Sequence, residues 1–326
     1  MNENKCENKC CNKKTSIGGQ ALIEGIMMRG PKITAMAVRN PKGEIVLEQW
    51  ETESSAKKGV RKIPFVRGIF NFIDSMRFGY KCLMRSAEIA GLEEEPKNED
   101  QTDTAEKENK KESSSFGMTL LMIASVVLGV ALAIGLFVAL PTFLYSLLAK
   151  VIPFFSEDDP FMRSAFEGVL KVVILVGYLA AVSLMKDIRR TFMYHGGEHK
   201  TIFCYEKGLP LTVENVRAQR RFHPRCGTSF LILMILVSIL ISMLIPTGIP
   251  TYLRVIIKLL LLPLIMGIGY ELIRFAGRHE NILTKIISAP GVWLQHLTVF
   301  EPDDEIIECA ITAMKQVIPE DESDNW

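Results

Sequence analysis

Residues 113–149, SSSFGMTLLMIASVVLGVALAIGLFVALPTFLYSLLA, contain no charged side chain. A helix needs about 20 mostly apolar residues to cross the hydrocarbon core of a bilayer. Residues 226–253 are also uncharged, and residues 164–185 and 254–274 are apolar apart from a few charges near their ends. The mean hydropathy of the chain is accordingly positive, at +0.19. These four stretches predict a multi-pass membrane protein, mainly α-helical, with about four transmembrane helices.

The first of these stretches is long for a single span. Pro141 could divide it into one span and an interfacial segment, or into a short hairpin. A hairpin would move the lysine- and arginine-rich region before residue 113 to the other side of the membrane, which argues against it.

The distribution of basic residues predicts the orientation in the membrane. Residues 186–227 carry nine lysines and arginines, whereas the connection between the first two spans has only Lys150 and Arg163. Basic loops stay in the cytosol. We therefore expect both termini and the segment 186–227 on the cytosolic side. Residues 1–14 are polar and lack the apolar region of a cleavable export signal.

The remaining sequence divides by composition. ITAMAVR and EIVLEQW flank the turn NPKG, which predicts a β-hairpin in a small cytosolic α+β portion. Residues 60–91 have the spacing of a basic amphipathic helix, which either rests on the inner leaflet or packs on the protein. The expected organisation is a disordered Cys-rich tip at 1–14, the α+β region at 15–91, a disordered acidic linker at 92–115, a four-span domain at 116–300 with cytosolic motif segments at 186–227 and 275–300, and a C-terminal helix and tail at 301–326.

The stretch YHGGEHKTIFCYE, residues 194–206, holds the first candidate chemistry. His195 and His199 are four residues apart and would share one face of a helix. The order H-x-x-E-H is that of an inverted zinc-hydrolase motif, in which two histidines bind zinc and Glu198 handles the proton of a water molecule. Gly196 and Gly197 weaken the analogy, because glycine costs about 1 kcal/mol in a helix interior. They could equally allow a close approach of the backbone.

A second group follows in RRFHPRCGTSF, residues 220–230. His223 and Cys226 have the three-residue spacing of nitrogen and sulfur metal ligands and directly precede a predicted span. With His195 and His199 they give four candidate ligands for a divalent transition metal, most suitably zinc. The alternative is that His223 and Pro224 form a turn and that Cys226 is a small buried residue.

Other polar residues could contribute to substrate binding or support the ligands. Glu24 and Arg29 are the only charges in the glycine-rich stretch 18–31, which predicts a loop or a strand pair, or else a turn with an exposed ion pair. Glu271 lies near the end of the last span and could pair with Arg274. The remaining candidates are His279 and Glu280, whereas His296 has the neighbours of a surface or packing histidine.

The seven cysteines do not predict disulfides, because most fall in segments assigned to the reducing cytosol. No CxxC pair supports thiol redox chemistry by Cys204 or Cys226. The cluster of Cys6, Cys10 and Cys11 lacks a clear fourth ligand.

Four motifs together resemble the YqhQ family of bacterial membrane proteins: GGQALIEGIMMRGP, YHGGEHKTIFCYE, FHPRCGTSFL and ELIRFAGRHEN. The resemblance covers residues 15–320 without the acidic linker. It implies a multi-pass protein of the bacterial plasma membrane, and it implies a metal-dependent enzyme, since the family has been described in that way without an assigned reaction. It does not identify the metal site.

The sequence thus predicts a metal-dependent hydrolase at the cytosolic face of the membrane, with Glu198 as general base. The substrate would be a lipid-like molecule or a peptide. The alternative is a non-enzymatic membrane scaffold or transport-associated protein whose basic segments contact anionic lipid headgroups. Neither reading involves nucleic acid, and the oligomeric state does not follow from the sequence.

Overall fold

The computed structural model describes residues 14–52, 63–92, 123–156, 158–279, 281–321 and 323–324. Apart from Lys14 and Leu92, the expected Cys-rich tip and the part of the acidic linker assigned to 92–115 lie outside the described residues.

The chain divides into two compact units. The sheet unit comprises Met1–Glu93, Val176–Met234 and Met266–Trp326, and the helical unit comprises Glu94–Leu175 and Ile235–Ile265. In chain order the elements are β1 (Gly18–Leu22), β2 (Gly25–Arg29), β3 (Ile33–Arg39), β4 (Ile45–Glu51), α1 (Val66–Ile89), η3 (Gly135–Ala139), α3 (Leu140–Val151), α4 (Pro160–Ser183), α5 (Lys186–Glu206), α6 (Val213–Arg217), α7 (Gly227–Ser242), α8 (Thr251–Arg278), α9 (Ile282–Thr298) and α10 (Asp304–Val317).

Four short strands form an antiparallel sheet in the order β1-β2-β3-β4. The hairpin predicted around NPKG is confirmed: β3 and β4 pair from Ile33 opposite Glu51 to Arg39 opposite Ile45. Gly43 in the turn has a φ of 86°, a conformation that side chains other than glycine rarely adopt. The glycine-rich stretch 18–31 forms the strand pair β1-β2, not an open loop.

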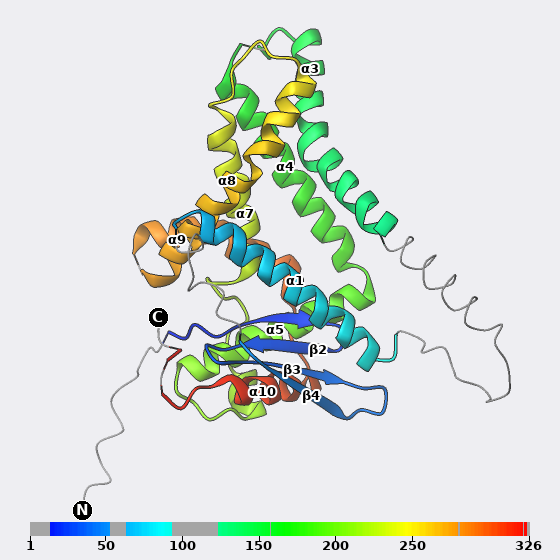
Figure 1. Cartoon of the computed structure of the whole chain (residues 1–326), viewed down its shortest axis with the longest axis vertical. Helices are drawn as coiled ribbons and strands as arrows, with labels where there is room; N and C mark the ends of the chain where they lie inside the picture. The colour runs from blue at the N-terminus through cyan, green and yellow to red at the C-terminus, as the bar shows by residue number, and fades with distance from the viewer. Residues whose placement is uncertain are drawn as a thin grey trace, which may run out of the picture. The chain divides into compact units, whose positions relative to one another are not determined.

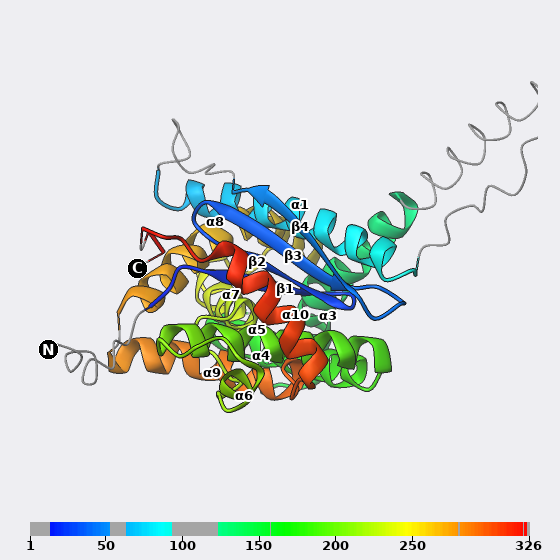
Figure 2. The same ribbon diagram turned by 90° about the horizontal axis from the view of Figure 1, so that it is seen from below.

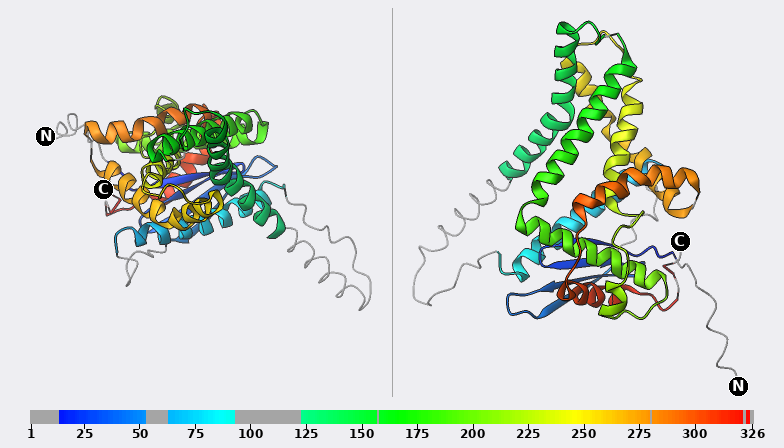
Figure 3. Two further views of the ribbon diagram at one scale, coloured as in Figure 1. Left: turned by 90° about the horizontal axis from the view of Figure 1, so that it is seen from above. Right: turned by 180° about the vertical axis from the view of Figure 1, so that it is seen from behind.

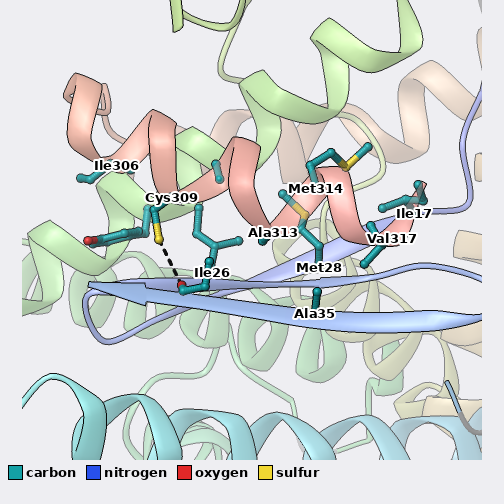
Figure 4. Close-up of a cluster of buried hydrophobic side chains, with 12 residues drawn as sticks. Ile17, Ile26, Met28, Ala35, Ile306, Cys309, Ala313, Met314 and Val317 are labelled. Carbon is teal, nitrogen blue, oxygen red and sulfur yellow. Dashed lines mark hydrogen bonds between the residues drawn. The ribbon is translucent and has the colours of Figure 1, made fainter. Parts of the chain in front are cut away.

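Both faces of the sheet are covered, and the alternation of side chains along each strand decides what each face contacts. One face packs against α10 through a cluster that includes Met28, Ala35 and Met314 (Figure 4). Met27 and Met36 point to the opposite face, where they pack with Cys82 of α1. Helices α1 and α10 therefore enclose the sheet from opposite sides (Figure 1).

The amphipathic helix expected at 60–91 is α1. Its packing on the sheet agrees with the second of the two expected roles, contact with the protein itself. Its other face leaves Ile73, Met76 and Tyr80 exposed, so contact with a lipid surface on that side is compatible with the same helix.

Helix α10 begins directly after an acidic capping residue. Asp303 is its N-cap, and its side chain accepts a hydrogen bond from the backbone N–H of Ile306 at 2.9 Å. The acidic start of the C-terminal segment thus has a structural use.

The segments 186–227 and 275–300 are largely helical. Residues 186–206 form α5, which runs beside the edge strand β1 and along α10 (Figures 2 and 3). Residues 282–298 form α9, whose N-cap Asn281 makes a reciprocal capping box with Thr284. Two helices therefore position the motif residues of these segments.

Helix α5 is continuous through Gly196 and Gly197, although paired glycines disfavour helix. A methyl group on Gly196 would overlap the backbone carbonyl oxygen of Phe300, and one on Gly197 would lie 3.0 Å from the Ile306 side chain. The close approach that the glycines permit is thus to the protein's own C-terminal segment.

Three helices among the described residues are long and apolar enough to cross a membrane: Ile123–Val151, Pro160–Ser183 and Thr251–Ala276. A fourth apolar helix, α7, has only 16 residues. At 1.5 Å per residue it is about 24 Å long, less than the roughly 30 Å of a hydrocarbon core. Three helices with the length and composition of membrane spans are thus present among the described residues, and the expected number of four is not reached by helix length.

Pro141 does not divide the first stretch into two spans, because the helix continues from Ile123 to Val151. The turn before the proline, η3, has the wider hydrogen-bonding pattern of a π-helix. Such a widening accommodates a residue that lacks a backbone N–H.

We predict that Gly196→Ala destabilises the protein by about 2–3 kcal/mol, because the added methyl group displaces the backbone at Phe300. The matched control is Gly177→Ala in α4, where a methyl group meets nothing within 4 Å and should be neutral or stabilising by up to about 1 kcal/mol. Thermal unfolding in detergent, followed by tryptophan fluorescence, compares the two. Equal melting temperatures would show that the approach of Phe300 does not constrain α5.

Candidate metal centre

One face of α5 carries the histidine motif. His195 and His199 lie one helical turn apart with ring centres 4.4 Å from each other. His199 is buried and His195 is half-buried. The i, i+4 spacing therefore does place both rings on one face, as the sequence predicts.

A backbone carbonyl fixes the orientation of each ring. Nδ1 of His195 lies 2.9 Å from the carbonyl oxygen of Thr298, and Nδ1 of His199 lies 2.6 Å from that of Arg221. A carbonyl only accepts, so both Nδ1 atoms carry the proton and both Nε2 atoms keep a lone pair in the neutral rings. Nε2 of His199 is buried and has no hydrogen-bond partner among the described residues.

Cys226 completes this group. It directly precedes α7, and its Sγ lies 3.1 Å from Nε2 of His195. The three potential ligand atoms of His195, His199 and Cys226 lie within 4.8 Å of one another. Tetrahedral bonds of about 2.0–2.3 Å place ligand atoms about 3.3–3.6 Å apart. The donor set and its buried lone pair thus fit a divalent transition metal after small side-chain movements.

His223 does not belong to this three-residue group, although its ring centre is 5.6 Å from that of His199. Its Nδ1 accepts a hydrogen bond from the backbone N–H of Arg225 at 3.2 Å, so the proton of the neutral ring is on Nε2. Burial is the main reason that its pKa falls to about 4, so the ring is neutral at pH 7. Nε2 lies 3.7 Å from a carboxylate oxygen of Glu206, which is too far for a hydrogen bond.

Glu198 also lies on α5, and its side chain contacts the start of β1. It is buried, and one carboxylate oxygen accepts the backbone N–H of Gly19 at 3.0 Å. Burial raises the pKa of this carboxyl, against smaller opposite effects of His195 and the Gly19 N–H. A methyl group on Gly19 would collide with the Glu198 side chain, so glycine at this position allows the contact.

Glu198, His199 and Cys226 line one pocket of about 180 Å³ in the sheet unit. Its walls come from the chain before β1 and the start of that strand, from α5, and from the segment before α7. They comprise Thr15, Ser16, Ile17, Gly18, Gly19, Glu198, His199, Ile202, His223, Arg225, Cys226 and Gly227. A carboxylate with a raised pKa, an imidazole lone pair and a thiol therefore face a common space of a few water molecules.

The structure places the other predicted residues away from this pocket. Glu24 pairs with Arg190 and accepts a hydrogen bond from the Tyr194 hydroxyl at 3.2 Å. Arg29 lines a separate pocket beside α1 and β4. The expected exposed pair of Glu24 with Arg29 is therefore replaced by a contact to α5.

Glu271, for which the sequence offers Arg274 as a possible partner, forms its ion pair with a different arginine. Its carboxylate instead accepts two hydrogen bonds from Arg67 of α1, at 2.6 and 2.5 Å. A bidentate guanidinium contact is stronger than a single-point pair three residues away on the same helix. His279 is exposed and stacks on Phe275, and Glu280 lies outside the described residues.

Sequence reasoning missed the residues that hold the motif in place. Gln295 of α9 makes two hydrogen bonds with the backbone of His223, at 2.8 and 2.7 Å. Glu206 accepts from Arg225 and from the backbone N–H of Thr15 at 3.0 Å. The sequence offers one signal for these two residues: the amide of Gln295 and the carboxylate of Glu206 each follow several apolar or aromatic residues.

The described cysteines are unpaired thiols, as the sequence predicts: Cys82, Cys204, Cys226 and Cys309 are all buried. The sulfur of Cys309 is used structurally, donating to the carbonyl oxygen of Ala37 in the core (Figure 4). Cys6, Cys10 and Cys11 lie outside the described residues.

We predict that Glu206→Gln lowers stability at pH 7 by about 3 kcal/mol, because Arg225 loses its buried partner. Burial alone would raise the pKa of the Glu206 carboxyl, but hydrogen bonds and the charge of Arg225 outweigh it and lower the pKa. The stabilisation is complete above the unfolded pKa of about 4.3 and is lost as pH falls through the lower folded pKa.

The variant should therefore melt at a lower temperature than wild type at pH 7, and the gap should narrow as the pH falls below about 4. Thermal unfolding across this range measures it, with the exposed Glu44→Gln as control. A difference in melting temperature between variant and wild type that stays constant with pH would contradict an ionised Glu206.

Comparisons with known proteins identify the family of this chain. Residues 63–320 match the family described as protein of unknown function, DUF1385. The chain is 38% identical over 303 residues to the uncharacterized protein YqhQ of Bacillus subtilis strain 168, and the match covers 92% of each chain. No solved structure matches this chain. The chain therefore belongs to the DUF1385 family of proteins of unknown function, which confirms the resemblance to YqhQ carried by its four motifs.

Proposed function

We propose that this protein is a membrane-anchored, metal-dependent hydrolase whose metal ligands are His195, His199 and Cys226. The observation that carries the proposal is the buried Nε2 of His199, which has a lone pair and no partner among the described residues. An unsatisfied buried acceptor costs about 1–3 kcal/mol. A metal ion held jointly with Cys226 and His195 would recover that free energy, and the bonds from both Nδ1 atoms to carbonyls are typical of metal-binding histidines.

Two histidines and one thiolate suit zinc, with a fourth position for water or substrate. When bound, such an ion supplies a Lewis acid that polarises a carbonyl or phosphoryl group and lowers the pKa of water. Glu198 would accept the proton of the attacking water and pass it to the leaving group, and burial, which raises its pKa, makes it a stronger base than an exposed carboxylate. The Gly19 N–H orients the carboxylate that does so.

The substrate would be a lipid-like molecule or a peptide at the membrane surface. The pocket is small, so it would admit the scissile group rather than the whole molecule. The adjacent Arg225 is held by Glu206 and gives this wall a fixed positive charge.

The finer topology belongs to the same proposal. The excess of lysine and arginine in 186–227 supports a cytosolic location for the sheet unit and both termini. The membrane would be the bacterial plasma membrane, and α7 would be a fourth, short span. A short span is accommodated by local thinning of the bilayer.

The short distance between Cys226 and His195 favours a second candidate function, in which the thiol acts as a nucleophile. Sγ of Cys226 lies 3.1 Å from Nε2 of His195, whose Nδ1 is held by Thr298. A thiol, a histidine and an orienting acceptor form a nucleophile–base arrangement. The unsatisfied His199 has no use in this chemistry, which is why the metal centre is preferred.

Elemental analysis of the detergent-purified protein tests the first proposal. We expect about one transition-metal ion per chain in wild type and its loss in His199→Ala and Cys226→Ala. Glu198→Gln should keep the metal, because Glu198 is not a ligand. The matched control is the exposed His296→Ala, which should also keep it.

A well-folded wild type that is metal-free after purification, and that takes up no zinc, nickel, cobalt, manganese or iron on dialysis, would refute the metal centre. It would leave the scaffold reading or the thiol reading. The thiol reading predicts that iodoacetamide labels Cys226 faster in wild type than in His195→Ala, as measured by mass spectrometry of the peptide. Equal labelling rates would exclude the nucleophile–base pair.

A further inference from the structure

The helical unit contains a buried cluster of charges that lies apart from the metal centre in the sequence. Its charged members with buried side chains, among the described residues of this unit, are Arg163, Glu167, Lys171, Arg254 and Lys258, each at most 8% exposed. Only one of them is an acid. Ionisable residues within membrane-spanning helices are rare and commonly mark a functional site.

The cluster lies between facing helices. Arg163, Glu167 and Lys171 follow one another at four-residue intervals along α4, so they form a row on one face. Lys258 of α8 pairs with Glu167 from the opposite side and donates to the Thr142 hydroxyl at 2.7 Å. Both helices are labelled in Figure 1.

Hydroxyl groups extend the cluster. Arg163 donates to Ser146 at 2.7 Å and lies 3.4 Å from Glu167. Ser146 is in turn 3.1 Å from the hydroxyl of Thr251, at the start of α8. The polar groups thus come from α3, α4 and α8, and most of them can donate a hydrogen bond to an anion.

The charges in this cluster do not balance. Arg163, Lys171 and Lys258 share the single carboxylate of Glu167, which leaves two formal positive charges (three minus one). Arg254 is a further buried cation close enough to act on Lys258, and its guanidinium donates to the Pro246 carbonyl at 2.6 Å. Buried charge in a low-dielectric setting requires a counter-charge.

Lys171 is the residue of this cluster that most needs a counter-charge. It lies 11 residues into α4, about 16 Å along the helix from Pro160. Its ammonium group has neither a hydrogen-bond acceptor nor a carboxylate within ion-pair distance among the described residues. Glu167 acts on it only at longer range and is already bonded to Lys258.

We propose that this cluster binds a phosphate group, and that the phosphate belongs to an anionic lipid. Guanidinium, ammonium and hydroxyl groups are the donors that bind phosphate. The location of the cluster on apolar helices favours a lipid over a dissolved ion. On their outer faces these helices expose apolar side chains: Val169 and Val173 of α4 are 65% and 59% exposed, and Leu260 of α8 is 75% exposed. Both helices have the length and composition of membrane spans, so a lipid can reach the cluster laterally within the bilayer, whereas a dissolved phosphate would have to enter hydrocarbon.

The test uses the full-length protein in nanodiscs of phosphatidylcholine alone, or of phosphatidylcholine and phosphatidylglycerol at about four to one. Native mass spectrometry counts retained lipid, and thermal unfolding measures stabilisation. We expect one retained phosphatidylglycerol and a higher melting temperature in the mixed discs. Lys171→Gln should reduce retention about tenfold, Lys171→Arg should restore it, and the exposed Lys150→Gln should match wild type.

A parallel sample in phosphatidylcholine discs receives inorganic phosphate. If phosphate alone raises the melting temperature and the effect disappears in Lys171→Gln, the site takes a dissolved phosphate and the lipid assignment is overturned. If neither lipid nor phosphate distinguishes wild type from Lys171→Gln, the phosphate site itself is overturned. A melting temperature of Lys171→Gln equal to wild type in phosphatidylcholine discs shows that the comparison concerns binding, not folding. If Lys171→Gln unfolds, the neutral and apolar variant Lys171→Met replaces it in the same comparison.

Discussion

The contact between Gly196 of α5 and the backbone of Phe300 is the constraint on which the candidate metal centre depends. Because no side chain separates the helix from this segment, the N–H of Phe300 reaches the Phe192 carbonyl at 3.0 Å. The carbonyl of Thr298 then reaches Nδ1 of His195. The ring is held with Nε2 toward Cys226, so the glycine that costs helix stability allows the orientation of a candidate ligand.

The parts of this structure that depend on local periodicity could be predicted from the sequence. Charge-free stretches predict membrane helices because hydrocarbon excludes charge over a known length. The turn NPKG predicts its hairpin because Gly43 supplies the required positive φ. His195 and His199 share a face because four residues make about one helical turn, and Cys226 lies beside His195 although it is 31 positions further along the chain.

The remaining contacts could not be predicted, and the reason is physical. The acceptors that orient the two imidazoles are backbone carbonyls of Thr298 and Arg221, and every residue has such a group. A sequence indicates only local partners for Glu271, such as Arg274 three residues away, because it does not show which distant segments pack together. The actual partner of Glu271, Arg67, is 204 residues away and is brought near by the packing of α1, where Gly68 lies against Tyr270.

The two buried polar clusters differ in what they leave unsatisfied, and this decides which ligands they can hold. At the metal centre, carbonyls and amides satisfy the Nδ1 atoms and Glu198, and an imidazole lone pair remains on His199. A lone pair binds a Lewis acid. Among the buried side chains described in the helical unit, Glu167 is the one carboxylate; it pairs with Lys258, and Lys171 is left without an ion-pair partner. A cation requires an anion. Since the unsatisfied groups have opposite polarity, one ligand atom cannot serve both, and the two proposed sites would bind ligands of opposite charge.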